Sequence, residues 1–370
     1  MILSFRYKDN IKKIITKRYY LEALRIAKGV MVMDRVDELL QTKEYSQLFE
    51  PSIERIKEKY LELAKVYHPD VWMDTRATEL FEHITELKEE AIRQLEQGVW
   101  EKDHEVFLEM ERGGWTSLKY KDTQDTEIGK MFWGADKIMY VIDEDKKKFY
   151  DNAVYQLSHL SYRDDSMREE FSPLFPEILK AGIAKNGSGI LVIRKGQNEY
   201  PLAEIQNRLG GIMEARHVAW IISRMCNICC YLQYRGIAHN GLTIDNLFVD
   251  PIDHKIKLYG GWWYAVEQYD SMLGTTAEVY EIMSDRAKGL KQGECITDQE
   301  MLHEIAKSLL GNKSMVFKSS EKKSIPDAMA GWIRNGSCGD AIEEFVSWNK
   351  VLDESFGPRK FIKLNIPGIC

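Results

Sequence analysis

The chain has 370 residues, 44% of them hydrophobic, which is enough for two globular domains that each bury a core. Its formal net charge of −7 argues against a nucleic-acid-binding protein, because phosphate binding needs a concentrated basic surface. No apolar stretch reaches the roughly 18 to 20 residues of a membrane-spanning helix, and residues 1–13 lack the apolar core of a secretory signal. We therefore expect a cytoplasmic protein that does not enter a membrane.

The six cysteines, at positions 226, 229, 230, 295, 338 and 370, are too scattered for a disulfide scaffold. Three of them fall within residues 226–230, but no second pair of Cys or His residues stands at the spacing of a zinc site. We predict reduced, buried thiols, no metal and no cofactor.

The secondary structure that the sequence predicts changes after about residue 100. Leu, Ile and Tyr recur at helical spacing up to about residue 100, and we assign 1–44 to a helical N-terminal extension and 45–110 to a helical domain. A polar segment that contains Gly113 and Gly114 follows, so 111–125 is predicted to be a linker. Residues 126–370 show short strand-like runs and then mostly helix, which indicates an α+β domain.

Within the helical domain the pattern predicts a helical hairpin. Ser52 is placed as the N-cap of a helix that must stop at His68, because Pro69 cannot continue it and restricts the residue before it. A second helix is predicted from about Thr75 to Leu95, antiparallel to the first.

The tip of this hairpin carries His68, Pro69 and Asp70. The run ERIKEKYLELAKVYHPD resembles the second helix and the signature loop of J domains, and LFEHI resembles the start of the helix that follows in that family. The resemblance implies a co-chaperone that binds a DnaK-type chaperone and stimulates its ATPase. In that role Asp70 would offer a carboxylate to an arginine, Pro69 would hold the loop, and His68 would fix it by hydrogen bonds.

The same resemblance implies a basic face on the first helix that steers the chaperone encounter. The basic residues there are Arg55, Lys57, Lys59 and Lys65. Glu58 and Glu62 interrupt this face, which predicts a weaker contact than the family pattern gives. The alternatives are a solvated helix face and an ordinary helix–loop–helix in which His68 only caps the helix.

The second domain contains YLQYRGIAHNGLTIDNLFVDPIDHKIKLYGGW, which resembles the catalytic and metal-binding loops of protein kinases. Aligned on that motif, His239 takes the place of the catalytic-loop histidine and Asn246 that of the metal-binding asparagine. Gly241 takes the place of the catalytic aspartate, Tyr259 that of the magnesium-binding aspartate, and Gly261 that of the glycine after it.

Other kinase landmarks are weaker. The run DNAVYQL is predicted to be the strand of the phosphate-binding lysine, which puts Tyr155 at the lysine position and Glu170 at the helical glutamate position. The glycine-rich loop is reduced to Gly129 and Gly134, and Asp298 stands where the family has a buried aspartate. The resemblance implies a bilobal kinase-like domain.

Phosphoryl transfer needs carboxylates for the metal and for the attacking hydroxyl, and a lysine for the phosphates. Glycine and tyrosine at those positions predict a catalytically inactive pseudokinase that binds a protein client or scaffold. The enzymatic alternative is a divergent nucleotide-dependent kinase or transferase that uses Asp245, Asp250 or Asp253 and is recruited to the chaperone. A third possibility is an interaction protein whose His-Pro-Asp loop binds no chaperone.

Overall fold

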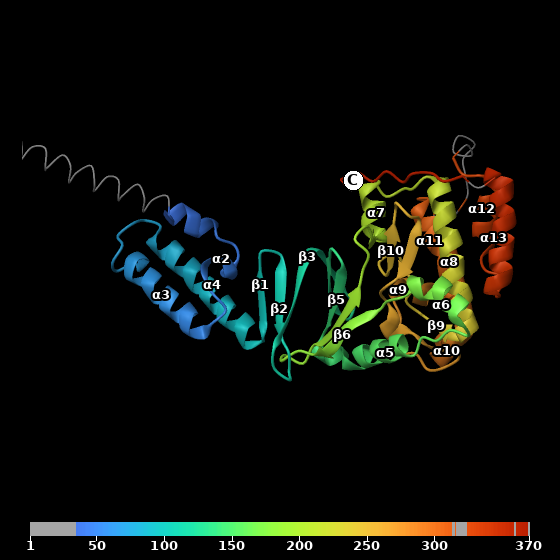
Figure 1. The fold of residues 1–370 in the computed structure, drawn as a ribbon. Coiled ribbons are helices and arrows are strands. Elements are labelled where there is room, and N and C mark those ends of the chain that lie inside the picture. Colours follow the sequence, from blue (N-terminus) through green and yellow to red (C-terminus); the bar gives the residue numbers. More distant parts are fainter. Residues whose placement is uncertain (1–34, 313–314, 316–323, 359, 369–370) are drawn as a thin grey trace, which may run out of the picture. The chain divides into compact units, whose positions relative to one another are not determined.

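The computed structural model describes residues 35–312, 315, 324–358 and 360–368, and it divides into two compact units (Figure 1). The first unit extends to residue 109 and includes 115–117, and the second comprises 110–114 and 118–370. Residues 1–34 of the predicted N-terminal extension lie outside the described residues.

The first unit contains the predicted helical hairpin. The first helix begins after Ser52, whose hydroxyl accepts a hydrogen bond from the Arg55 backbone N–H, and it ends at the C-cap His68. Pro69 follows at the point where the helix must stop. The elements of the unit are a helix that includes residues 35–41, α2 (Tyr45–Leu48), α3 (Ile53–Tyr67), α4 (Ala77–Glu96), β1 (Val99–Lys102) and β2 (Glu105–Glu109).

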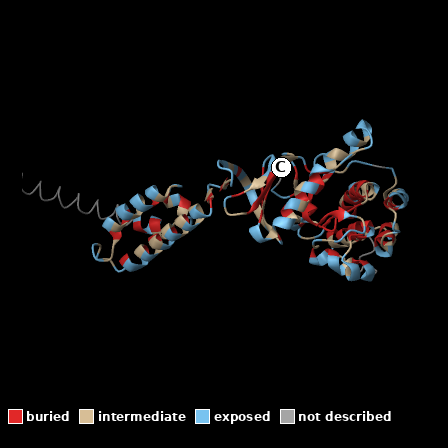
Figure 2. Ribbon diagram, turned by 90° about the horizontal axis from the view of Figure 1, so that it is seen from below, coloured by how far each residue is buried: buried red, intermediate tan, exposed pale blue. Residues whose placement is uncertain are grey.

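Helices α3 and α4 pack along their apolar stripes, and buried residues lie between the helices of this unit in Figure 2. One small core joins α3 and α4 to residues 35–41, where Val36 is fully buried. A second core lies at the other end of the hairpin, where Ile56, Leu87 and Ala91 contact Trp100 of β1. Each end of the hairpin therefore packs against a neighbouring segment of the chain.

The second unit begins with an antiparallel sheet in the order β3-β4-β5-β7-β6. Strands β5 and β7 are mostly apolar and buried, and Tyr140 of β5 stands opposite Leu191 of β7. The elements of this lobe are β3 (Trp115–Thr126), β4 (Gly129–Gly134), β5 (Lys137–Ile142), η1 (Glu144–Lys146), α5 (Lys147–Ser158), α6 (Asp165–Phe171), η2 (Ser172–Leu174), β6 (Ile178–Ile183) and β7 (Gly189–Arg194).

Two sequence predictions fail in this lobe. The predicted linker 111–125 is mostly strand β3, because its backbone pairs with β4 although most of its side chains are polar and partly exposed. The run DNAVYQL, predicted to be a strand, lies in helix α5. Tyr150, Ala153 and Leu157 recur there at helical spacing and bury one face against the sheet.

A mainly helical lobe follows, built around the long helix α8, which packs against α11 and α13 (Figure 1). Its elements are β8 (Tyr200–Pro201), α7 (Leu202–Arg208), α8 (Ala215–Arg235), β9 (Ile237–Ala238), β10 (Leu247–Asp250), β11 (Lys255–Leu258), η3 (Trp262–Tyr264), β12 (Val266–Glu267), α9 (Ala277–Ile282), α10 (Asp285–Leu290), α11 (Cys295–Leu309), α12 (Asp327–Asn335) and α13 (Ala341–Phe356).

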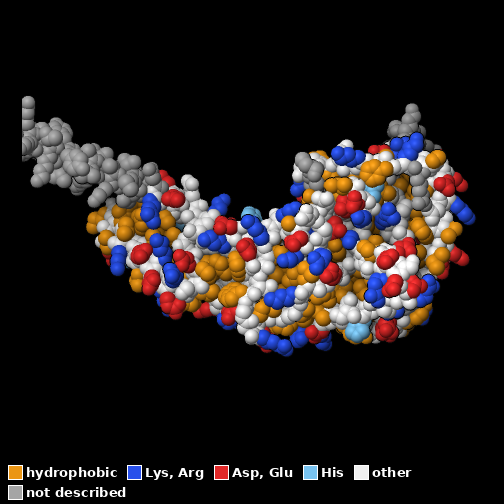
Figure 3. Space-filling view, viewed as in Figure 1, with side chains coloured by type: hydrophobic (Ala, Val, Ile, Leu, Met, Phe, Trp, Pro, Cys, Tyr) orange, Lys and Arg blue, Asp and Glu red, His pale blue; other side chains and the backbone are white. Residues whose placement is uncertain are grey.

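The thiols of Cys226 and Cys229 lie buried within α8, as predicted for packed cysteines. Among the described residues, no group of three or more His, Cys, Asp or Glu side chains could hold a metal ion. Within those same ranges, none of the helices combines the length and the hydropathy needed to cross a bilayer. On the face shown in Figure 3, basic and acidic side chains are interspersed.

Candidate functional site

The tip of the α3–α4 hairpin is organised around His68. Its backbone carbonyl accepts hydrogen bonds from the N–H groups of Val71 and Trp72, at 2.8 and 2.9 Å, which close the turn. Its ring nitrogen Nδ1 accepts from the Asp70 N–H at 3.2 Å, and the ring packs edge-on against Phe81, 4.8 Å between centroids. His68 therefore holds the loop from both its backbone and its side chain.

Asp70 points its charge outward from this loop. Its side chain is 89% exposed, and its carboxylate lies 3.5 Å from His68 Nδ1. The hydrogen bond to His68 fixes the Asp70 backbone, and the exposed carboxylate is open to a cationic partner group.

The predicted basic face of α3 is partly neutralised. Arg55 pairs with Glu50 at 3.2 Å, and Lys59 pairs with Glu62 at 3.3 Å. Lys57 and Lys65 are exposed. Glu62 thus interrupts the basic face in the structure, as it does in the sequence.

In the second unit, the loop after β9 is anchored to helix α11. The carboxylate of Asp298 accepts backbone N–H groups from His239 at 2.7 Å and from Asn240 at 3.0 Å. Asp298 is 1% exposed, and burial raises its pKa to about 7, against the lowering effect of the two N–H donors. The aspartate singled out in the sequence is therefore a buried anchor for this loop.

His239 itself is enclosed. It is fully buried, and its ring stands perpendicular to Trp262 at 4.9 Å between centroids. Desolvation lowers its pKa to about 3, so the imidazole is neutral at physiological pH.

The loop packs directly against the segment that follows β11. The Asn246 side-chain amide donates to the Gly241 carbonyl at 2.8 Å. A Cβ on Gly260 would lie 2.0 Å from Asn246 Oδ1, and a Cβ on Gly241 would lie 3.1 Å from the Gly261 Cα and carbonyl O. The predicted loop residues are therefore brought together, but no carboxylate stands at Gly241, where an added side chain would crowd the Gly261 backbone.

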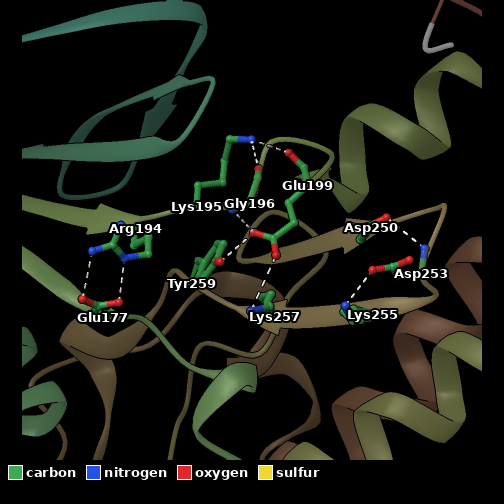
Figure 4. A network of polar contacts seen from close by, with 10 residues as sticks. All are labelled: Glu177, Arg194, Lys195, Gly196, Glu199, Asp250, Asp253, Lys255, Lys257 and Tyr259. Atoms are coloured by element: carbon green, nitrogen blue, oxygen red, sulfur yellow. Dashed lines mark hydrogen bonds and ion pairs between the residues drawn. The ribbon is translucent and has the colours of Figure 1, made fainter.

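Tyr259 turns toward residues 195–199, the connection between β7 and β8 (Figure 4). Its hydroxyl donates to Glu199 Oε2 at 2.6 Å, and the same oxygen accepts the Gly196 N–H at 2.7 Å. Burial raises the pKa of Tyr259, so the phenol keeps its proton. A protonated phenol committed to Glu199 is not a magnesium ligand.

Two lysines complete this network (Figure 4). Lys257 Nζ lies 3.6 Å from Glu199 Oε1, and Lys195 Nζ donates to the carbonyls of Gly196 and Glu199, at 2.6 and 2.8 Å. Lys195 is 2% exposed, and burial lowers its pKa to about 8. Lys195 therefore binds two backbone carbonyls, and Lys257 lies beside the Glu199 carboxylate.

The predicted kinase position of Tyr155 is wrong, because the residue lies in a helix and not in a strand. Tyr155 is exposed on helix α5 and stacks on His159, and Glu170 is exposed on α6. In protein kinases the third strand of this lobe carries the phosphate-binding lysine. The third strand here is β5, and none of its buried residues, Ile138, Met139, Tyr140 and Ile142, is a lysine. The apolar run KIMYVI forms this strand, and nothing in its pattern marks Tyr140, which is a tyrosine and not a lysine.

A cavity of about 510 Å³ lies beside Asn246 in the second unit. One part of it is lined by residues 124–127 at the end of β3, Met131 of β4 and Tyr140 of β5. The rest is lined by Thr243, Asp245, Asn246, Trp263 of η3 and the start of α9. The sequence motif singled out Asn246 and Asp245, whereas the contributions of β3 and α9 carry no local signal.

Neither a protein-family model nor a curated protein matches the chain. Solved structures do match it, among them that of vaccinia related kinase 3, at 14% sequence identity and a TM-score of 0.45. That match covers 67% of this chain and 90% of the other. A likeness of this size carries no activity across. The second unit itself combines a sheet-rich lobe with a helical lobe and resembles a kinase-like fold.

Proposed function

We propose that the chain is a non-catalytic co-chaperone that binds a DnaK-type chaperone through the His-Pro-Asp tip and a protein client through its kinase-like unit. The observation that carries the proposal is the state of Asp70, an exposed carboxylate at the tip of a helical hairpin whose turn is closed by hydrogen bonds to His68. An acceptor presented in this way suits a guanidinium of a partner protein.

The interior of the second unit supports a non-catalytic role. The positions that would hold metal and orient a hydroxyl carry Gly241 and Tyr259, and the lysines near the 195–199 connection bind protein carbonyls and Glu199. The cavity beside Asn246 is lined by four carboxylates and, among the described residues, by no Lys or Arg. Such a lining repels the phosphates of a nucleotide.

The test is the single-turnover ATPase rate of a DnaK-type chaperone with the wild-type chain, with Asp70→Asn and with Glu89→Gln. Wild type and Glu89→Gln, which removes an exposed charge from α4, are expected to accelerate hydrolysis at least about tenfold. Asp70→Asn should lose that acceleration without loss of fold, because the side chain is 89% exposed. No stimulation by wild type, or equal stimulation by Asp70→Asn, would contradict the proposal.

A thermal-denaturation series with Mg²⁺ and ATP tests the non-catalytic part. A ligand that binds only the folded state raises its melting temperature. We expect no rise for this chain. A concentration-dependent rise would instead favour a divergent nucleotide-dependent enzyme.

A further inference from the structure

Another cavity, of about 550 Å³, lies in the helical lobe between α8 and α13. The chain after α13 runs back past the end of α8 (Figure 1), and residues 357, 358 and 360–362 complete the lining together with His254 of the β10–β11 turn. Most of the lining is apolar, with Trp220 from α8, Phe356 from α13 and Phe361 from the C-terminal segment. A cavity of this size accommodates a ligand of a few residues.

Stacked rings hold the C-terminal segment at this cavity. His254 lies parallel to Trp220, at an interplanar angle of 2° and 4.3 Å between centroids, and Phe361 stacks on His254 at 20° and 4.3 Å. Phe361 is nevertheless 69% exposed, so the stack presents a fixed aromatic ring to solvent. A ligand that covers this ring removes apolar surface from water, which is favourable.

The charged side chains of the lining are basic, namely Arg216 and Arg224 of α8 and Lys360 of the C-terminal segment. Among the described residues, no Asp or Glu lines the cavity, and none of the three cations has an ion-pair partner. Arg224 donates through Nε to the His254 carbonyl at 3.1 Å, and its two Nη groups stay available. The net charge of the chain is −7, so the cavity is opposite in sign to the chain as a whole. Charge complementarity therefore favours an anionic ligand.

Spacing and hydrogen-bonding capacity restrict the ligand further. Arg216 and Arg224 are eight residues apart on α8, about 12 Å along the helix, which matches two carboxylates about four residues apart in an extended peptide. Asn227 also lines the cavity, and its side-chain amide has no hydrogen-bond partner among the described residues. That amide offers a donor and an acceptor, which complement a peptide backbone unit. An acyl chain has neither group, and a helical ligand uses its own internally.

We infer that this cavity binds an extended acidic peptide segment of a partner protein. One Asp or Glu side chain pairs with Arg216 and a second with Arg224, and an apolar side chain between them packs against Phe356 and Phe361. The inference rests on the client-binding role proposed for the kinase-like unit and gives the client segment a chemical class. It does not depend on the contact of Asp70 with a chaperone.

The first experiment measures binding of the full chain to the rhodamine-labelled peptide Gly-Glu-Leu-Phe-Ser-Glu-Gly, by anisotropy at low and at physiological salt. The comparison peptide has Gln in place of both Glu residues. We expect the Glu peptide to bind at least about tenfold more tightly than the Gln peptide and to weaken with salt. Equal binding of the two peptides would overturn the inference, whatever the variants do.

Two controls test the class of ligand. A peptide with its two Glu residues adjacent keeps the charge but not the spacing, and it should bind several-fold more weakly. Equal affinity would reject the pairing of one carboxylate with each arginine. Unlabelled peptide should displace the probe at concentrations at which decanoate and ATP do not. Displacement by either compound at the same concentration as the peptide would overturn the assignment to a peptide.

The second experiment locates the site. Arg216→Gln with Arg224→Gln removes two charges at exposed positions of α8 and should weaken Glu-peptide binding about tenfold. Arg168→Gln with Arg334→Gln removes the same charge from exposed positions of α6 and α12, which do not line the cavity, and should change binding less than twofold. Equal weakening by both pairs would mean that the peptide follows net charge only, and the site would be rejected.

Phe361→Ala removes the exposed ring and leaves every charge of the cavity in place. It should weaken binding several-fold without changing the salt dependence, because it removes apolar contact only. Unchanged affinity in this variant would place the peptide outside the cavity and contradict the inference. Asp70→Asn should bind the peptide like wild type, so loss of chaperone stimulation and loss of peptide binding can be told apart.

Discussion

Asp298 anchors the loop that follows β9 in the second unit. One buried carboxylate accepts two consecutive backbone N–H groups, those of His239 and Asn240. Burial disfavours the charged form of Asp298, while the two N–H donors favour it. Burial has the larger effect, so the pKa is raised to about 7. Because the folded pKa is above the unfolded one, protonation favours the folded state.

Asp298→Asn tests this at the residue scale. The raised pKa gives wild type a stabilising contribution that is present below about pH 4 and is lost as pH rises through 7. The difference in free energy of unfolding, wild type minus variant, should therefore fall between about pH 4 and 7 by an amount on the order of a few kcal/mol and then level off. Urea titrations at several pH values measure it. A difference that does not change with pH would show that the carboxyl titrates normally in the folded protein.

At the scale of elements, the Asn152 side chain hydrogen-bonds helix α5 to the segment after β11. Asn152 donates from its amide to the carbonyls of Trp263 at 3.0 Å and Ala265 at 2.8 Å. Helix α5 also packs closely on η3. The helix thereby fixes η3 and, with it, the position of Trp263 in the wall of the cavity.

Asn152→Ala should lower the free energy of unfolding by about 1 to 3 kcal/mol, because two carbonyls lose their donors. Asp151→Ala on the same helix removes an exposed ion pair with Lys147 and should cost less than about 1 kcal/mol. Denaturant titration gives both values. Equal stability of the two variants would show that the Asn152 hydrogen bonds do not stabilise the fold.

At the scale of the whole molecule, the described chain has separate cores. Leu80 and Ile84 belong to a small core in the first unit, whereas Ile228 belongs to the large core of the second. Each unit therefore buries apolar surface of its own, which is the condition for cooperative unfolding of a domain.

Calorimetry of the full chain should accordingly show two unfolding transitions. Ile84→Ala and Ile228→Ala each leave a cavity that costs about 2 to 5 kcal/mol. We expect each variant to lower the melting temperature of one transition and to leave the other in place. A single transition that both variants shift together would show that the units unfold as one.

Local pattern was enough for some elements. Proline at 69 and apolar residues at helical spacing determined the α3–α4 hairpin and its tip, and unbroken apolar runs determined β5 and β7. The local pattern failed where strand pairing or packing against the sheet decides the secondary structure instead of composition. Polar residues 115–126 form a strand because β4 supplies hydrogen bonds, and 147–158 form a helix because one face covers the sheet.

The sequence by itself determined the residues of the His-Pro-Asp tip and the absence of carboxylates at Gly241 and Tyr259, since both depend only on residue identity and order. Tertiary structure alone decided that Tyr259 is committed to Glu199 and that Tyr140 and Trp263 line an acidic cavity. These residues are separated by 60 or more positions in the chain, and only the packing of the strands and helices brings them within contact.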